Sequence, residues 1–109
     1  MTHTVTVALP PSEILARAKR FFAERVPHAS AFVEKEGPEF VVLRGQGGEE
    51  LVLNARLLAK GEGNEQREGV GGGRDGGERS RVRASTLYFD QAVDRFFSTL
   101  PLESGVEVA

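Results

Sequence analysis

The hydrophobic pattern of this chain changes its period along the sequence, and this change constrains the fold more than any other feature. Apolar and polar side chains alternate in five segments, residues 4–9, 29–36, 39–45, 49–60 and 79–89. A period of two is typical of half-buried β-strands. Two further segments space their apolar side chains as a helix does, one from Ser12 to Pro27 and one from Asp90 to Pro101. The pattern predicts the order β-α-β-β-β-β-α.

The connections between the predicted strands decide how the strands pair. Most of them are short or contain no helix, and parallel strands need a long crossover. The length of 109 residues, of which 39% are hydrophobic, suits one compact domain. We therefore expect an α+β domain over residues 1–101, with a five-stranded antiparallel sheet and both helices on one face.

Two segments lack the pattern of a packed element. Residues 61–78 contain eight glycines and no apolar side chain except Val70. Such a segment cannot bury enough surface to offset the entropy of ordering, so we expect a mobile, acidic, glycine-rich loop. Residues 102–109 are predicted to form a frayed tail.

The alternation along each strand indicates which side chains the helices leave uncovered. Leu51 and Leu53 belong to the row that suits the core in the fourth strand, as Val82 does in the fifth. The same alternation directs Tyr88 inward and Phe89 outward. The opposite rows mix arginines with apolar side chains, a composition that favours a binding surface over a plain solvated one. The candidate binding residues on this face are Arg56, Arg81, Arg83, Val52, Leu58, Leu87 and Phe40.

Arginines stand at alternate positions of the fifth predicted strand, at Arg79, Arg81 and Arg83. Side chains two residues apart on a strand lie about 7 Å apart on one face. This is close to the spacing of phosphates along an extended nucleic-acid strand, so the row suits an anionic partner. The competing interpretation, which we favour, is that these arginines form ion pairs with Glu50 and other acids across the sheet.

Composition excludes several classes of function. A net charge of −2 and a pI near 5.7 exclude a protein that coats nucleic acid through charge alone. Without cysteine there is no disulfide, Cys-ligated zinc or iron–sulfur cluster. His3 and His28 have no acidic cluster beside them in the sequence, so we expect no metal and no cofactor.

The chain matches an enzyme motif in its sequence pattern but not in the structural context that the motif requires. The run from Gly71 to Gly76 fits G-x-G-x-x-G, yet a strand follows it where dinucleotide binding requires a helix. Carboxylates on the predicted strands do not converge on a pocket, so we expect no enzyme. The amino-terminal segment lacks a signal-peptide pattern and no apolar run is long enough to cross a membrane. We expect a cytoplasmic protein that does not bind membranes.

The order of elements over residues 4–100 resembles a single repeat of the TATA-binding-protein fold. It is also similar to a reduced helix-grip domain of the START and polyketide-cyclase kind. The first resemblance implies a half-saddle that a second copy would complete, and the second implies a cavity for a lipid. We expect a non-catalytic binding or interaction module that forms a homodimer through the open sheet face. Two alternatives remain: a nucleic-acid-binding protein that uses the arginine-rich sheet face, and a small lipid- or polyketide-binding protein.

Overall fold

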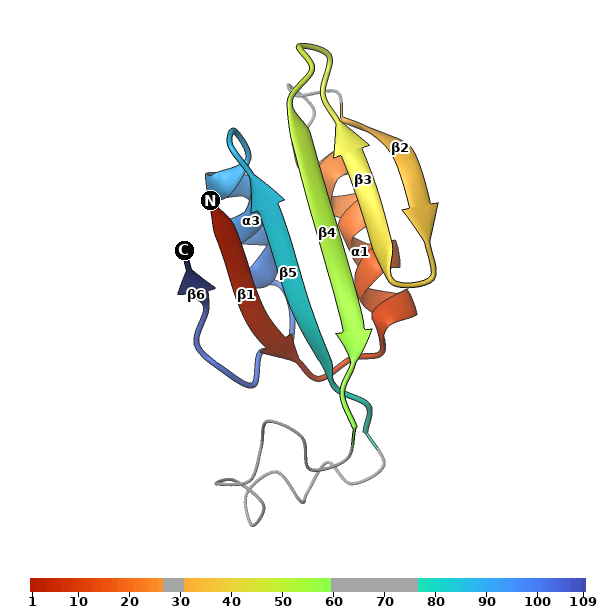
Figure 1. The fold of residues 1–109 in the computed structure, drawn as a ribbon, viewed down its shortest axis with the longest axis vertical. Helices are drawn as coiled ribbons and strands as arrows, with labels where there is room; N and C mark the ends of the chain where they lie inside the picture. The colour runs from red at the N-terminus through yellow and green to blue at the C-terminus, as the bar shows by residue number, and fades with distance from the viewer. Residues whose placement is uncertain (27–30, 60–76) are drawn as a thin grey trace.

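The described part of the chain folds into one sheet with two helices packed against it. The computed structural model of the protein describes residues 1–26, 31–59 and 77–109. Its elements are β1 (Thr2–Val7), α1 (Pro11–Glu24), β2 (Phe32–Gly37), β3 (Phe40–Arg44), β4 (Glu50–Leu57), β5 (Ser80–Thr86), α3 (Asp90–Phe97) and β6 (Glu107–Val108). The strands pair antiparallel in the order β2-β3-β4-β5-β1-β6 (Figure 1). The predicted α+β class, with an antiparallel sheet and two helices, is confirmed.

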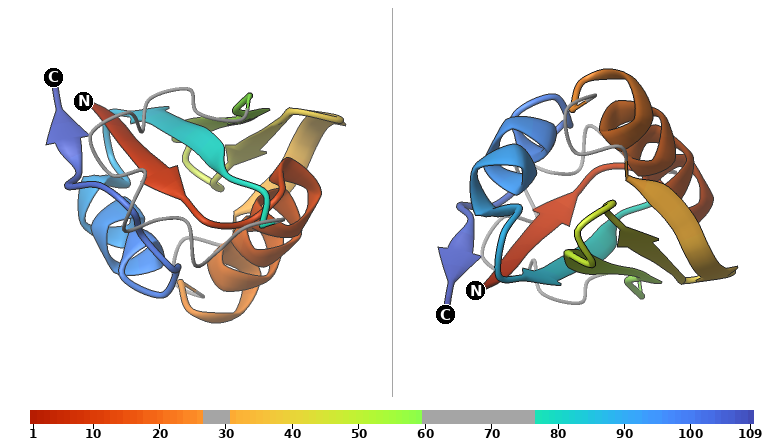
Figure 2. Two further views of the ribbon diagram at one scale, coloured as in Figure 1. Left: turned by 90° about the horizontal axis from the view of Figure 1, so that it is seen from below. Right: turned by 90° about the horizontal axis from the view of Figure 1, so that it is seen from above.

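Both helices lie on the same face of the sheet (Figure 2). Beneath them, Val41, Leu43, Leu51 and Leu53 are almost fully buried. Apolar side chains of β1, β5 and both helices complete one continuous core, to which α1 contributes Ile14, Leu15, Ala18, Phe21 and Phe22, and α3 contributes Ala92, Val93, Phe96 and Phe97. Among the described residues, neither helix is long and apolar enough to span a membrane.

Phenylalanine rings join the two helices to each other. Phe21 and Phe96 have ring centroids 5.4 Å apart, and Phe22 lies 6.0 Å from both Phe96 and Phe89. Tilted and edge-on rings at these distances attract each other in addition to the area they bury. Aromatic contacts therefore hold the two helices together over the sheet. The rings of each helix stand at the helical spacing of apolar side chains that the sequence predicted.

The sequence predicts Ser12 as the N-cap of the first helix, whereas the observed N-cap lies two residues earlier. Pro10 is its N-cap and Pro11 its first residue, and the Pro10 carbonyl accepts the backbone N–H groups of Glu13 and Ile14. Proline suits the first position of a helix because that residue has no intrahelical use for an N–H group. The second helix begins at Asp90, and Phe89 is its N-cap.

The prediction of five strands is wrong by one. The additional strand, β6, lies in the segment 102–109 that was predicted to be frayed. It pairs with β1, with His3 opposite Val108 and Thr4 opposite Glu107, and the Glu103 N–H donates to the Thr6 carbonyl at 2.8 Å. A two-residue strand has no periodicity to detect, so only the exposed edge of β1 explains its formation. Residues 60–76, which hold most of the predicted glycine-rich loop, and His28 lie outside the described residues.

The predicted alternation fails at the ends of two strands. β5 ends at Thr86, after which Tyr88 is 71% exposed and Phe89 is buried in the core, the reverse of the predicted directions. β4 ends at Leu57, which is 44% exposed, and Leu58, predicted on the open face, is buried. A period of two holds only while the chain stays extended, so each turn resets which side chains point inward.

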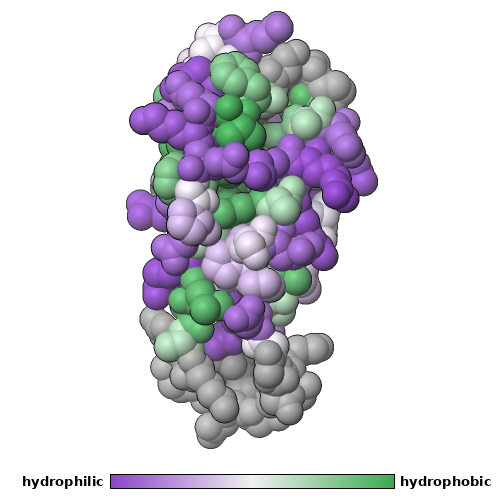
Figure 3. Space-filling model, turned by 90° about the vertical axis from the view of Figure 1, so that its right-hand side faces the viewer, coloured by the Kyte–Doolittle hydropathy of each residue, from purple (hydrophilic) through white to green (hydrophobic). Residues whose placement is uncertain are grey.

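One edge of the sheet is formed by β2, whose side chains are largely exposed. Its register shifts between Val33 and Lys35, and it carries Glu34, Lys35 and Glu36 in succession. Seen from this edge, the surface is largely hydrophilic with small apolar areas between (Figure 3). Bulges and charges at an edge oppose pairing with another sheet, so β2 is protected against edge-to-edge association.

Candidate binding site on the open face

Three arginines form a cluster on the open face, which is the face of the sheet opposite the helices. Arg56 of β4 lies directly across from Arg81 of β5, and Arg83 follows two residues later on the same side. All three are exposed, whereas the intervening Val82 and Ala84 are fully buried. Like charges directly opposite each other in a sheet are destabilising. We call Arg56, Arg81 and Arg83 the arginine cluster.

The described acidic side chains near the open face form ion pairs with Arg44 and Arg79, and not with Arg81 or Arg83. Glu50, the partner predicted for the arginine row, forms an ion pair with Arg44 at 3.1 Å, and Glu34 bonds the same guanidinium at 2.9 Å. Arg79 lies 3.8 Å from Glu103 and is mostly buried.

Arg81 and Arg83 keep their charge available. The Arg81 Nε donates to the Thr6 hydroxyl at 3.3 Å. Within residues 1–26, 31–59 and 77–109, no carboxylate forms an ion pair with Arg81 or Arg83. The alternative interpretation, in which acids neutralise the row, therefore holds for Arg79 and not for these two.

The described part of the open face has a positive balance of charged side chains, whereas the whole chain has a negative net charge. The chain carries a net charge of −2. On the described part of the open face, cations outnumber carboxylates: the cations are Lys35, Arg44, Arg56, Arg81 and Arg83, and the acids are Glu34, Glu50 and Glu107. Local fields act over roughly a Debye length, about 8 Å at physiological salt. An anion approaching the described part of this face therefore meets more cations than carboxylates despite the overall charge.

A hollow lies at the end of β5, beyond the arginine cluster: none of the three arginines lines it, but Ser85, two residues after Arg83, does. The hollow has a volume of about 450 Å³, and Val52, Ser85, Leu87 and Tyr88 are among its lining residues. Leu87 is 79% exposed and Tyr88 is 71% exposed. Both side chains lie in the turn after β5, which the continuous alternation did not predict. The sequence did contain a signal for this turn, because a helix that begins at Asp90 requires a turn of a few residues before it. We call this feature the Leu87 hollow.

The remaining predicted site residues are placed as follows. Val52 is half-buried between Val42 and Ser85 in the register, and Phe40 is half-buried opposite Asn54. Leu58 is only 7% exposed and offers little surface. The structure therefore brings the predicted arginines, Val52, Phe40 and Leu87 to one side of the sheet and removes Leu58 from the accessible set.

His3 contacts two acidic residues that lie far from it in the sequence. Its Nε2 lies 2.7 Å from Asp90 Oδ1, and its Nδ1 lies 3.4 Å from Asp94 Oδ1. The imidazole is buried, whereas Asp94 is exposed. The hydrogen bond from His3 holds the pKa of Asp90 below its ordinary value of 3.8, and the nearby amino terminus adds to this effect. Among the described residues, no group of acids and histidines is arranged to hold a metal ion.

The centre of the layer between sheet and helices is filled by side chains. Phe22, Phe96 and Leu53 are at most 1% exposed and occupy the interior where a lipid cavity would have to lie. Comparisons of the chain with models of protein families, with curated proteins and with solved structures gave no match.

Proposed function

We propose that the protein is a non-catalytic binding module whose open face holds a single-stranded nucleic acid. The observation that carries this proposal is the arginine cluster beside the Leu87 hollow, in which Arg81 and Arg83 have no carboxylate partner among the described residues. Proteins that bind single strands combine cations for the phosphates with exposed rings or apolar groups for the bases. The open face offers the cations on β4 and β5 and the exposed apolar and aromatic groups in the turn that follows β5.

The spacing of these groups suits an extended strand. Arg81 and Arg83 project from one face of β5 about 7 Å apart. Ser85 follows on the same row, and the exposed Leu87 and Tyr88 stand at the end of the strand. Phosphates at the arginines would place a base in the Leu87 hollow. Contacts to phosphates give affinity and position without selecting sequence, so we expect weak sequence preference.

The test is a titration of a fluorescein-labelled oligothymidylate with the protein at low salt, followed by fluorescence anisotropy. The double variant R81Q/R83Q removes two charges from the open face. The matched control R17Q/R20Q removes two charges from α1 in the opposite layer. We expect the open-face variant to weaken binding by at least about tenfold, because hydrogen bonds to charged groups each contribute roughly 1.5–3 kcal/mol. The control should bind as the unmodified protein does.

Two outcomes would overturn the proposal. One is the absence of saturable binding at low salt, and the other is an equal loss of affinity in both double variants. A duplex of the same length is the third arm of the experiment. If it binds more tightly than the single strand, the partner is double-stranded and the role assigned to the Leu87 hollow is wrong.

A homodimer through the open face is the second candidate function. It is favoured by apolar side chains exposed on or beside that face, among them Phe32 at 52% and Leu87 at 79% exposure. Resemblance to a half-saddle that a second copy completes points the same way. Sedimentation velocity should then show a concentration-dependent dimer, and Val52→Asp should abolish it by placing an unpaired charge in the interface. A protein that stays monomeric at about 100 μM, some hundredfold above a micromolar Kd, would exclude this candidate.

A further inference from the structure

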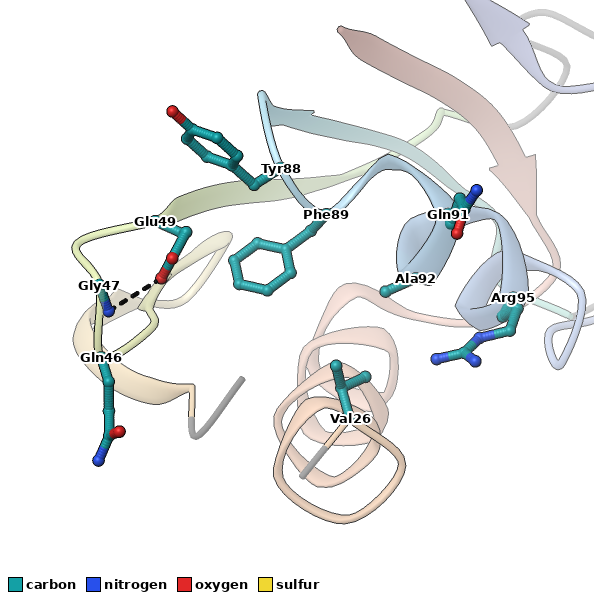
Figure 4. A pocket seen from close by; sticks show the side chains of 9 residues that line it. All are labelled: Val26, Gln46, Gly47, Glu49, Tyr88, Phe89, Gln91, Ala92 and Arg95. Atoms are coloured by element: carbon teal, nitrogen blue, oxygen red, sulfur yellow. Dashed lines mark hydrogen bonds between the residues drawn. The ribbon is translucent and has the colours of Figure 1, made fainter. Parts of the chain in front are cut away.

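A second hollow lies between the β3–β4 hairpin and the beginning of α3 (Figure 4). Its volume is about 610 Å³, which is within the range of sites for small organic ligands. Phe89, Val26 and Ala92 line it and are each less than 10% exposed, so they form an apolar base. We call it the Phe89 pocket. It is separate from the arginine cluster, although Tyr88 lines both this pocket and the Leu87 hollow.

Opposite charges line the two sides of this pocket. Arg95 projects from α3 and Glu49 from the hairpin, with the ring of Phe89 between them (Figure 4). One carboxylate oxygen of Glu49 accepts the backbone N–H of Gly47 at 3.1 Å, which fixes the side chain. Glu49 and Arg95 form no ion pair with each other or with another residue in the described part of the chain. Both charges are therefore available to a ligand.

We propose that the Phe89 pocket binds a small aromatic molecule that has an acidic group at one end and a hydrogen-bond donor at the other. The guanidinium of Arg95 would bind the acid through two parallel hydrogen bonds. The ring would lie against Phe89, where aromatic contacts add to the burial of apolar surface. The donor at the far end would reach the second carboxylate oxygen of Glu49.

The polarity of the pocket argues against simpler ligands. A neutral apolar molecule would displace water from Arg95 and Glu49 without replacing the lost hydrogen bonds. A small inorganic anion would satisfy Arg95, but it would leave the apolar base uncovered and Glu49 without a donor. A ligand with both ends polar and an apolar middle is the class that satisfies Arg95, Phe89 and Glu49 together.

The probe for this site is 4-(aminomethyl)benzoate, which carries a carboxylate and an ammonium group at opposite ends of one ring. It is titrated to about 10 mM into the 15N-labelled protein, since a ligand of this size binds with modest affinity. We expect saturable shifts of the backbone amides of Gly47, Glu49, Phe89 and Ala92. Shifts confined to other regions, or no saturable shift, would overturn the proposal.

Two control ligands each lack one polar end. They are 4-methylbenzoate, without the ammonium group, and 4-methylbenzylamine, without the acid. Both should bind several-fold more weakly than the probe, because each leaves one charged side chain unpaired. Equal affinity for all three ligands would show that only the apolar base contributes.

Protein variants identify which side chain binds which end. Arg95→Gln should weaken the probe about tenfold and leave 4-methylbenzylamine unchanged. Glu49→Gln should weaken the probe while leaving 4-methylbenzoate unchanged, and its amide oxygen can still accept the Gly47 N–H. Arg20→Gln, which removes one charge from α1, is the matched control. The inference stands apart from the proposed function, because R81Q/R83Q should bind the probe normally.

Discussion

The hydroxyl of Thr86 stabilises the turn that follows β5, and this turn sets which side chains reach the open face. The hydroxyl donates to the Glu50 carbonyl at 2.9 Å and accepts the backbone N–H groups of Tyr88 and Phe89 at 3.2 and 3.1 Å. Thr86 is 7% exposed, so water cannot easily replace these bonds. One buried side chain thus holds the turn that exposes Tyr88 and buries Phe89.

We expect Thr86→Val to lower the free energy of unfolding by about 1–3 kcal/mol. Valine keeps the shape of threonine but leaves buried backbone donors and an acceptor without a partner. The matched control is Thr4→Val on β1, where the side chain is half-exposed, and it should change stability by less than about 0.5 kcal/mol. Urea unfolding measures both. Equal stabilities of the two variants would show that the Thr86 hydroxyl does not support the turn.

Asp90 makes the stability of the fold depend on pH. Its pKa is lowered in the folded protein, chiefly by the hydrogen bond from His3. A carboxylate with a lowered pKa contributes stability that is present above its unfolded pKa and is lost as the pH falls through its folded pKa. Asp90→Asn should therefore destabilise the protein at pH 7 and have a smaller effect below its ordinary pKa of 3.8.

The measurement is urea unfolding at neutral and at acidic pH. Glu39→Gln, on the exposed turn between β2 and β3, controls for the removal of one negative charge. If Asp90→Asn changes stability by the same amount at both pH values, the contact with His3 contributes nothing to the acid sensitivity.

At the scale of elements, the helices are held on the sheet by rings from both ends of the chain. Phe22 of α1 is 1% exposed and contacts Phe21, Phe89 and Phe96. We expect Phe22→Ala to lower the free energy of unfolding by about 3–5 kcal/mol through lost burial and the cavity it leaves. Phe32 on the β2 edge is 52% exposed, so Phe32→Ala should change it far less. Comparable losses in the two variants, measured by thermal and urea unfolding, would contradict this assignment of the core.

The sequence predicted the interior of each element better than its ends. Arg81 and Arg83 alternate with Val82 and Ala84, and this pattern placed the arginines on the uncovered face. The reversal at Tyr88 and Phe89 is held by three hydrogen bonds of the Thr86 hydroxyl, which donates one and accepts two. The periodicity of the sequence cannot predict such bonds.

The periodicity of the sequence could not predict contacts between segments that are far apart in the chain. His3 and Asp90 are 87 residues apart in the chain, and β6 is only two residues long. Both form because β1 lies between β5 and the carboxyl-terminal segment. The arginine cluster was accessible to prediction because the period of a strand fixes its faces. The two hollows were not, because turns form their walls.

At the scale of the whole molecule, the described part of the open face carries more cations than carboxylates although the chain has a net charge of −2. Salt dependence tests whether these cations bind a nucleic acid, as the proposed function requires. If Arg56, Arg81 and Arg83 each contact one phosphate, affinity for a single strand should fall about twentyfold between about 50 and 200 mM salt. The R81Q/R83Q variant retains one such contact, so its affinity should fall about threefold over the same range. Anisotropy titrations at several salt concentrations give both slopes. Identical slopes for the two proteins would mean that these arginines do not contact phosphates.

Tyr88 belongs to the walls of both the Leu87 hollow and the Phe89 pocket. A molecule that turned this ring to fit one cavity would alter the shape of the other, and the two occupancies would then be thermodynamically linked. Such linkage is reciprocal: the factor by which the first guest changes affinity for the second equals the factor by which the second changes affinity for the first. In this way one exposed tyrosine would couple the binding of ligands on two sides of a small domain.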